Sequence, residues 1–317
     1  MSGKPAVEVR MVTQRAKDEK TPQQQMETIK KDTEARREKD FDEHRKTMTA
    51  LHRSGGRKRK EDAPPPISLN RPFLDPDCIP DDAFIAVFGK RRTGKSFLIR
   101  HLLYLKRHRF RHGLVITKTK HNGYWQNYFP MNVVHGDYDP RIIENFLIYQ
   151  LKLQKYNRDH PDKAVNTKAV IILDDIIADH YIKYCDALAT LCYNGRHFDV
   201  CVIVASQYVK GLPPGVRGNC DVVFAFTQGQ ERQRQAMAED YGDKIYDDDF
   251  FFEMLDANTQ DRHTLVINLS DPNCDLDQMF FTFKAEETPM FEIGSRAWKE
   301  TVWLDNEKKL KAHYTDK

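Results

Sequence analysis

Residues 89–96 constrain the fold of this chain more than any other part of the sequence. They read GKRRTGKS and match the pattern G-x-x-x-x-G-K-[ST] at every fixed position. The apolar run 84–88 comes directly before them, and a helical pattern at 97–106 comes directly after. A strand, a glycine-bracketed loop and a helix in this order form a cradle for phosphate groups. The sequence therefore predicts a nucleotide-binding α/β domain built around this P-loop.

The chemistry of phosphate binding assigns a role to each fixed position of the P-loop. Gly89 and Gly94 let the main chain curl so that its N–H groups point at phosphate oxygens, and the following helix adds its positive end. We expect Lys95 to reach the β- and γ-phosphates and the Ser96 hydroxyl to bind Mg²⁺. The remaining expected nucleotide contacts are Arg92, Thr93 and Phe97.

From residue 84 onward, short apolar runs alternate with helical patterns. This alternation predicts a mostly parallel sheet with helices on both faces. The expected strands after the first are 114–117, 132–135, 169–173, 200–204 and 222–226, and the expected helices include 141–155 and about 181–193.

Two acids follow the apolar run 169–173, as expected of the second element of a phosphate site. Asp174 is predicted to hold Mg²⁺, and Asp175 to polarise the attacking water. The second acid, together with the lack of an N-K-x-D motif, favours ATP over GTP. An additional strand at 114–117 is expected between the P-loop and the acidic element, which fits the P-loop enzymes that have an inserted strand and an added catalytic acid. Gln207, just after the run 200–204, is the candidate sensor of the γ-phosphate.

Two arginines are candidates for a cation supplied to a neighbouring subunit's site. Arg196 precedes the run 200–204, and Arg217 precedes the run 222–226. Arginine suits the role because its planar fork stays charged and grips two oxygens. Each could equally be structural, for example by pairing with Asp221, and the sequence leaves this choice open.

The N-terminal part differs in composition from the rest. Residues 1–66 hold 17 Lys/Arg and 12 Asp/Glu, a charge of +5, whereas the whole chain carries +3 and the remainder therefore −2. We expect residues 1–66 to be a disordered or partly helical tail, with a helix possible at 23–52. The basic run 57–60 is either a nuclear-import or nucleic-acid patch or a solubilising segment. The ATPase domain is expected at 67–290 and a polar extension at 291–317.

Other features limit the cellular context. No apolar run of about 18 residues is present, and no secretory signal follows the N-terminus, so neither a transmembrane segment nor secretion is expected. The six cysteines form no C-x-x-C pair and are expected to be buried, reduced thiols.

Four segments together resemble a known family. In order they are GKRRTGKS, VIILDD, NGRHFDVCVIVASQ and LPPGVRGNCDVVFAF. They resemble the genome-packaging ATPases of large eukaryotic DNA viruses, the poxvirus-type branch of the FtsK–HerA class of DNA pumps. The resemblance covers residues 84–226, about half of the chain.

The resemblance implies a RecA-like core that uses ATP and Mg²⁺, assembles as a ring homo-oligomer and moves double-stranded DNA into a preformed capsid. Capsid or portal-vertex proteins are the implied partners, and assembly sites in the host cytoplasm or nucleus, or the virion, are the implied locations. It carries over Lys95 and Ser96 as nucleotide and metal contacts, Asp174 as the metal-side acid, Asp175 as the catalytic acid and Gln207 as the sensor. The wider class usually has Glu at the position of Asp175.

Two other functions fit the same motifs. One is a cellular-type DNA translocase or helicase, and the other is a nucleotide-binding assembly scaffold that does not hydrolyse ATP. A chain that holds DNA needs a basic patch or loop on its otherwise neutral body. Candidate DNA-contacting loops lie at 118–122 and around 210–214.

Overall fold

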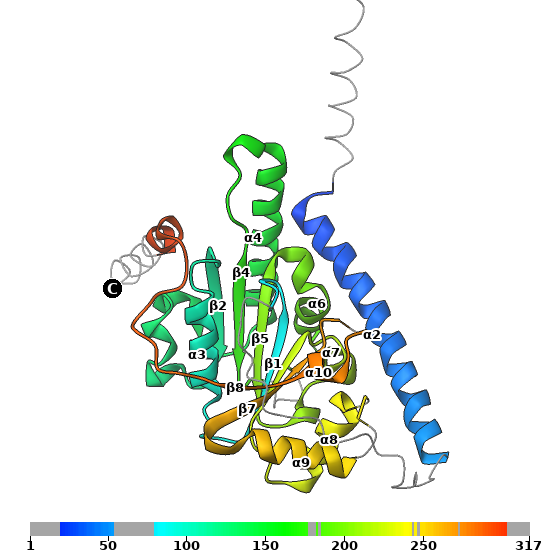
Figure 1. Ribbon diagram of the computed structural model, residues 1–317. Helices are drawn as coiled ribbons and strands as arrows, with labels where there is room; N and C mark the ends of the chain where they lie inside the picture. The colour runs from blue at the N-terminus through cyan, green and yellow to red at the C-terminus, as the bar shows by residue number, and fades with distance from the viewer. Residues whose placement is uncertain are drawn as a thin grey trace, which may run out of the picture.

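One eight-stranded sheet organises the residues that this computed structural model describes, which are 20–53, 79–176, 182, 185–242, 244–245, 248–271 and 273–302 (Figure 1). Its strands are β1 (Phe84–Phe88), β2 (His112–Thr117), β3 (Val134–His135), β4 (Ala169–Asp174), β5 (Val200–Ser206), β6 (Val222–Ala225), β7 (His263–Asn268) and β8 (Phe280–Lys284). Their order across the sheet is β3-β2-β4-β5-β1-β6-β7-β8. β1 to β6 pair in parallel, and β7 and β8 add two antiparallel strands at one edge.

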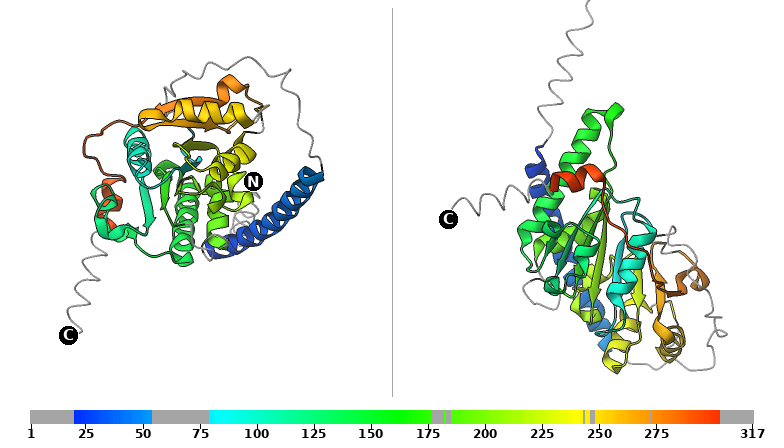
Figure 2. Two further views of the ribbon diagram at one scale, coloured as in Figure 1. Left: turned by 90° about the horizontal axis from the view of Figure 1, so that it is seen from below. Right: turned by 90° about the vertical axis from the view of Figure 1, so that its left-hand side faces the viewer.

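Helices cover both faces of this sheet (Figure 2). They are α2 (Pro22–Arg53), α3 (Lys95–Leu105), α4 (Pro140–Asp159), α6 (Asp186–Asn194), α7 (Pro214–Arg217), α8 (Glu231–Tyr241), α9 (Asp248–Asn258) and α10 (Leu276–Met279), with a last helical segment at 296–302. One apolar core packs α4, α6 and α2 against the sheet, and the other packs α3 against the opposite face. Since both faces are covered, the central strands are apolar throughout, and the predicted α/β fold with a mostly parallel sheet is confirmed.

The strand order decides which chain segments meet. β5 pairs with β1 on one side and with β4 on the other. The strand that separates the P-loop strand from the acidic strand is therefore β5, whereas β2, the additional strand of the sequence, lies on the far side of β4. A strand between these two elements is the arrangement of RecA-like P-loop domains. The carboxyl ends of the parallel strands form one edge, and the P-loop, Asp174 and Gln207 all lie there.

The predicted strands do not include β7 and β8. β7 has four buried residues, of which Leu265, Val266 and Ile267 are apolar, and in β8 two of the five residues are buried. The predicted helix at about 181–193 appears as α6, and residues 177–181, 183 and 184 lie outside the described ones.

The N-terminal helix α2 packs against the domain along part of its length. Met26 and Thr33 are buried, and the Asn194 amide donates a hydrogen bond to the Thr33 hydroxyl at 2.9 Å. Lys30 forms an ion pair with Glu144 of α4 at 2.6 Å. The first part of the helix is therefore attached to α4 and α6. The basic run 57–60 lies outside the described residues.

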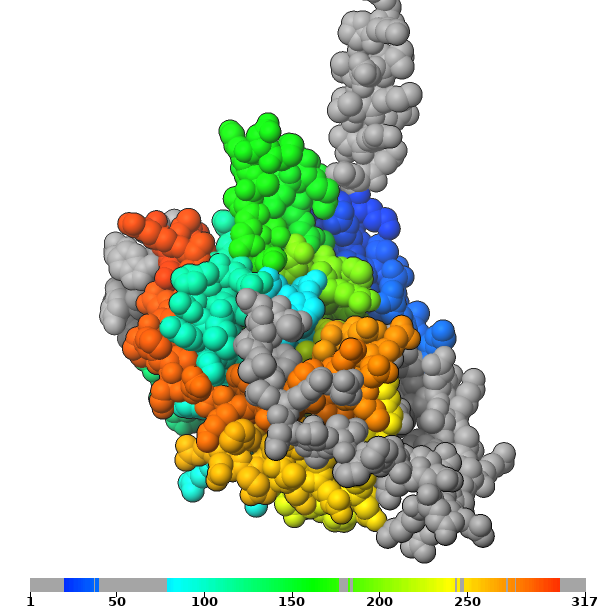
Figure 3. Space-filling model, viewed as in Figure 1, coloured from blue at the N-terminus to red at the C-terminus, as the bar shows by residue number. Residues whose placement is uncertain are grey.

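Residues 285–302, here called the strap, cross the face of the sheet that carries α3. Phe291, Ile293 and Trp298 are buried there, so the chain beyond residue 290 packs on the domain through residue 302. Figure 3 shows the strap (orange to red) on the surface beside the teal segment that includes α3. The strap is held by a hydrogen bond from the Ile293 N–H to the Tyr128 carbonyl, 2.9 Å long.

The cysteines of the described residues are free thiols. Cys192, Cys201 and Cys220 are buried, whereas Cys185 and Cys274 are half-buried, and Cys78 lies outside the described residues. Burial raises the pKa of Cys201 and of Cys220 to about 12, which keeps both protonated. None of the helices described here is long and apolar enough to cross a membrane.

Replacing Met26 with alanine tests the docking of α2. Met26 is 3% exposed and belongs to the apolar core, so its truncation leaves a cavity there, and we expect a loss of about 2 kcal/mol in the free energy of unfolding. Met290→Ala is the matched control because Met290 is 73% exposed. Denaturant unfolding of both variants measures the difference. Equal stabilities of the two would show that α2 contributes nothing to the folded domain.

Candidate nucleotide site

The P-loop connects β1 to α3 and adopts backbone angles that few side chains tolerate. Gly94 has φ 108°, and Arg92 has φ 66°. A Cβ atom on Gly89 would lie 2.6 Å from the Thr93 hydroxyl and 2.9 Å from Cβ of Phe226. Both glycines are therefore required for the loop to close over Phe226.

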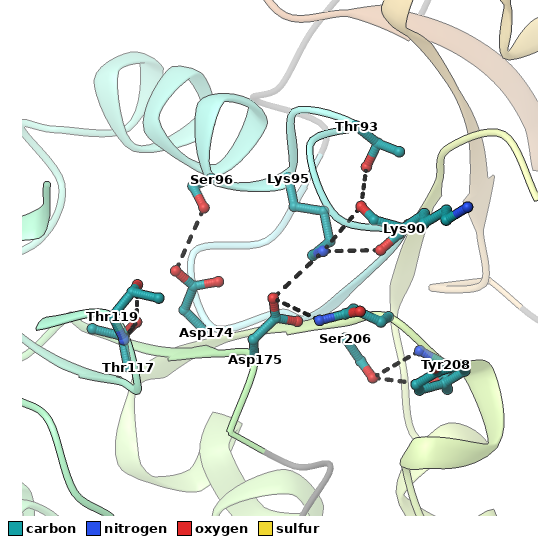
Figure 4. Close-up of polar contacts among 12 residues, drawn as sticks. Lys90, Thr93, Lys95, Ser96, Thr117, Thr119, Asp174, Asp175, Ser206 and Tyr208 are labelled. Carbon is teal, nitrogen blue, oxygen red and sulfur yellow. Dashed lines mark hydrogen bonds and ion pairs between the residues drawn. The ribbon is translucent and has the colours of Figure 1, made fainter. Parts of the chain in front are cut away.

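Lys95, the first residue of α3, is buried beneath the P-loop. Its Nζ donates to the carbonyl of Gly89 at 2.9 Å and to the carbonyl of Lys90 at 3.4 Å. The same ammonium lies 3.6 Å from Oδ2 of Asp175 (Figure 4). Only 6% of the Lys95 side chain is exposed. This places a fixed cation at the mouth of the cradle.

Asp174 is the last residue of β4 and is buried beside the start of α3. Its Oδ2 accepts a hydrogen bond from the Ser96 hydroxyl at 3.5 Å and one from the indole N–H of Trp125 at 2.9 Å. Burial raises the pKa of the Asp174 carboxyl, and the Trp125 bond acts in the opposite direction. The carboxylate is thus costly in the isolated protein, and a cation would stabilise it.

Asp175 points away from Asp174 although the two are adjacent in sequence. It has φ 53°, and its main-chain N–H donates to the carbonyl of Ala205 at 3.1 Å. The left-handed backbone turns its carboxylate toward Lys95 (Figure 4). The Gln207 amide donates to the same oxygen, Oδ2, at 3.4 Å. The two adjacent carboxylates therefore face different residues: Asp174 faces Ser96, and Asp175 faces Lys95.

The residues at this edge fit a magnesium nucleotide. The Ser96 hydroxyl and the Asp174 carboxylate are oxygen donors, which Mg²⁺ prefers, and it commonly takes one or two protein oxygens plus phosphates and water. Among the described residues, no cluster of three or more His, Cys, Asp or Glu side chains forms a metal site of its own. Lys95 and the N–H groups of the P-loop would then hold the phosphates.

Two aromatic residues that the sequence analysis missed support this site. Tyr124 donates its hydroxyl to the Ser96 carbonyl at 3.1 Å, and Trp125 donates to Asp174. Burial raises the pKa of Tyr124 to about 12, so it remains a donor. The pair stands between β2 and β3, remote in sequence from both partners. The only feature of the sequence that could have indicated these two residues is their position as an aromatic pair in the otherwise polar segment 118–127.

The other predicted nucleotide contacts have varied surroundings. Arg92 is exposed, and Thr93 donates its hydroxyl to the Lys90 carbonyl at 2.9 Å. Phe97 is half-buried, with the Arg100 guanidinium 4.4 Å from the centre of its ring. Their contacts with a nucleotide stay predictions.

The two candidate arginines lie in different environments. Arg217 is buried, forms an ion pair with Asp240 at 2.8 Å and donates to the Leu212 carbonyl at 2.6 Å. Arg196 is exposed at the opposite end of β5 from the P-loop, on a cavity of about 170 Å³ that Asp221 also lines. The geometry favours Arg196 over Arg217 for contact with another molecule, and the partner of Arg217 is Asp240.

Comparison with known proteins places this site in a family. The sequence model of the poxvirus A32 protein family matches residues 75–233, half of the chain, including the P-loop, both aspartates and Gln207. The chain belongs to the poxvirus A32 protein family. The resemblance drawn from the four motifs is thereby confirmed.

Relatives of this A32-family chain come from several viruses. Uncharacterized protein 075L of Invertebrate iridescent virus 6 is 35% identical over 187 residues, which are 59% of this chain and 70% of that protein. Uncharacterized protein L437 of Acanthamoeba polyphaga mimivirus is 25% identical over 240 residues, 74% of this chain and 81% of that protein.

A solved structure with a similar chain is the genome packaging NTPase B204 from Sulfolobus turreted icosahedral virus 2 in complex with AMPPCP. It is 17% identical, and the match covers 65% of this chain and 100% of that one with a TM-score of 0.48.

Asp174→Asn tests the electrostatic cost of the buried carboxyl. Because the folded-state pKa is raised above its ordinary value of 3.8, ionisation of Asp174 destabilises the fold at neutral pH, and this cost disappears below that value. In a chelating buffer, the variant is expected to melt at a higher temperature than wild type at pH 7, with a difference that shrinks as the pH falls toward 4. A difference that does not change with pH would contradict this assignment.

Trp125→Phe tests the hydrogen bond that positions Asp174. Loss of the indole N–H frees the carboxylate to turn, so the Mg²⁺ concentration for half-maximal ATP turnover should rise about 10-fold or more. Trp298→Phe is the control, since Trp298 is also buried but belongs to the strap. An unchanged Mg²⁺ requirement in Trp125→Phe would show that Asp174 is positioned without Trp125.

Proposed function

We propose that this A32-family chain is a Mg²⁺-dependent ATPase that packages a viral double-stranded DNA genome into the capsid as a ring oligomer. One observation carries the catalytic part of the proposal: Ser96 and Lys95 of the P-loop face Asp174 and Asp175 at the carboxyl end of β4. Membership of the poxvirus A32 family supports the packaging role.

The residues divide the work of hydrolysis. Lys95 and the P-loop N–H groups hold the β- and γ-phosphates, while Ser96 and Asp174 hold Mg²⁺, which offsets charge on the phosphate oxygens. Asp175 is oriented by Gln207 and, as a carboxylate, accepts a proton from the attacking water. Its side chain is 31% exposed, so water reaches it. This second acid distinguishes a hydrolase from a scaffold that only binds nucleotide.

Arg196 supports assembly into a ring. In this parallel sheet, Arg196 precedes β5 and the P-loop follows β1, so the two lie at opposite edges of the same subunit. We therefore assign Arg196 to the phosphate site of a neighbouring subunit, where its charge stabilises phosphoryl transfer. Arg217 is retained as a buried structural residue.

DNA and capsid contacts complete the proposal. Lys118 is exposed at the edge that carries the nucleotide, whereas Lys210 forms an ion pair with Glu239. The loop 118–122 is therefore the better of the two predicted DNA-contacting loops. Capsid or portal-vertex proteins are the proposed partners, at assembly sites in the host cytoplasm or nucleus.

ATP binding and turnover of three variants, with and without double-stranded DNA, test the proposal. Lys95→Ala should abolish turnover because the phosphates lose their buried cation. Asp175→Asn should keep ATP affinity and lose turnover by a factor of about 10² or more. Asparagine tolerates the left-handed backbone of this position, so the fold is preserved. Asp137→Asn, at an exposed aspartate, is the matched control.

Three results would contradict this function. Unchanged turnover in Lys95→Ala would remove the P-loop assignment. A fall in affinity without a fall in turnover per bound ATP would exclude Asp175 as the catalytic acid. Turnover that DNA does not stimulate, in a particle that light scattering shows to be monomeric, would exclude a ring motor.

A further inference from the structure

A cavity of about 510 Å³ lies at the amino edge of the sheet, away from the nucleotide site. It is lined by the loop between α3 and β2, by Asn166 and by the strap, and it is open to solvent. Main-chain hydrogen bonds join these segments: the Arg111 N–H donates to the Lys168 carbonyl at 2.8 Å, and the Ser295 N–H donates to the Arg111 carbonyl at 2.6 Å. In Figures 1 and 2 the final helix of the strap (orange-red) lies toward the end of the sheet from which α4 projects.

This cavity is independent of the P-loop. Arg111 directly precedes β2, and the last residue of β2, Thr117, pairs with Asp174. The two sites are therefore one strand apart, roughly 20 Å at 3.3 Å per residue. A ligand in one leaves the other accessible.

The lining of the cavity is strongly basic. Arg107, His108, Arg111 and Lys299 line it together with a single acid, Glu292. Glu292 already accepts a hydrogen bond from Lys299 at 2.7 Å. The loop reads KRHRFR over residues 106–111, the kind of local basic segment that a DNA-binding protein with a neutral body requires.

The cations of this loop fall into two groups. Lys106 and Arg109 form ion pairs with Asp81, at 2.9 and 3.2 Å, and so serve the fold. Arg107 and Arg111 form no ion pair with any residue that the structure describes. Arg107 and Arg111 are therefore the two arginines of the loop whose charge is available to bind a ligand.

The contacts of the two arginines suit them to bind such a ligand. The Arg107 guanidinium lies 4.0 Å from the centre of the Tyr104 ring and donates to the Tyr104 carbonyl. Nε of Arg111 is buried and has no hydrogen-bond partner among the described residues. A buried N–H of a guanidinium requires an acceptor, and a phosphate offers several oxygens to the guanidinium fork.

Basic residues continue beyond the cavity. The Asn166 amide donates to the Arg109 carbonyl at 2.7 Å, which joins the loop to the segment that follows α4. Lys163 in that segment and Arg158 at the end of α4 are both exposed. A surface with several cations in succession suits a polymer of phosphates better than a single small anion.

We propose that Arg107 and Arg111 form a pocket for a phosphate of the DNA backbone at the amino edge of the sheet. The inference rests on the proposed function and adds, at the amino edge, a second DNA-contacting surface to the loop proposed at the nucleotide edge. Guanidinium contacts with phosphate carry no base information, so the grip is independent of sequence, as a packaging motor requires. The predicted loops at 118–122 and 210–214 follow the carboxyl ends of β2 and β5, at the other edge of the sheet.

The salt dependence of DNA binding tests this pocket. The full chain and its variants Arg107→Gln and Arg111→Gln are titrated with a short fluorescent duplex of mixed sequence at increasing chloride concentrations. Each variant should lose about 0.9 from the magnitude of the slope of log K against log salt, because one phosphate contact is gone. Arg111→Lys keeps the charge and should retain the slope. Arg141→Gln is the matched control, since Arg141 is exposed near the other edge.

The outcomes separate this proposal from the proposed function. Wild-type slopes in both glutamine variants would overturn the pocket and leave the ATPase motor intact. Equal losses of the salt slope in Arg111→Gln and Arg111→Lys, with lowered melting temperatures in both, would overturn the pocket, because the loss would then come from damage to the fold. Calorimetric binding of inorganic phosphate that Arg111→Gln abolishes, without any change in DNA slope, would assign the pocket to a free anion instead. A wild-type chain that hydrolyses ATP but does not bind DNA would overturn both proposals.

Discussion

The contact between Ser96 and Asp174 is the constraint on which the rest of the site depends. It joins the first turn of α3 to the end of β4, two segments 78 residues apart in sequence. β5 lies between β1, which leads into the P-loop, and β4, which ends at Asp174, and so fixes the separation of these two strands. Because the strands are parallel, the P-loop and Asp174 lie at the same edge of the sheet. Any change that shifts β4 relative to β1 would separate the metal-side acid from the phosphate loop.

The burial of Asp174 makes this contact both useful and costly. A carboxylate in a largely apolar setting has a raised pKa, and Trp125 and Ser96 offset only part of the cost. A divalent cation would supply the missing compensation, so binding of a magnesium nucleotide would stabilise the folded state at this point. The neighbouring Asp175, half-exposed and turned by its left-handed backbone, is free of that constraint and accessible to water.

The sequence predicted those features that short-range chemistry determines. The P-loop and β1 follow from spacing alone, and the ends of β4 and β5 follow from apolar runs that stop at Asp174 and just before Gln207. The sequence did not predict that Trp125 bonds to Asp174, because the two meet only through the pairing of β2 with β4.

Other parts were missed for related reasons. Arg217 was weighed against Asp221 as a partner, but its ion pair is with Asp240 of α8, which only the folded chain brings near. The docking of α2 depends on few apolar residues, chiefly Met26, in a helix that is otherwise polar, so composition alone indicated a free tail. The basic loop 106–111 could be identified in the sequence. Only the folded chain shows that the strap lines the same cavity as this loop.

A crystal structure of the chain with Mn²⁺ and a non-hydrolysable ATP analogue tests the central claim most directly. We expect an anomalous manganese peak between the Ser96 hydroxyl and the Asp174 carboxylate, with Lys95 against the β- and γ-phosphates and Asp175 facing the terminal phosphorus. A metal peak elsewhere, or a nucleotide whose phosphates lie outside the P-loop, would contradict the account.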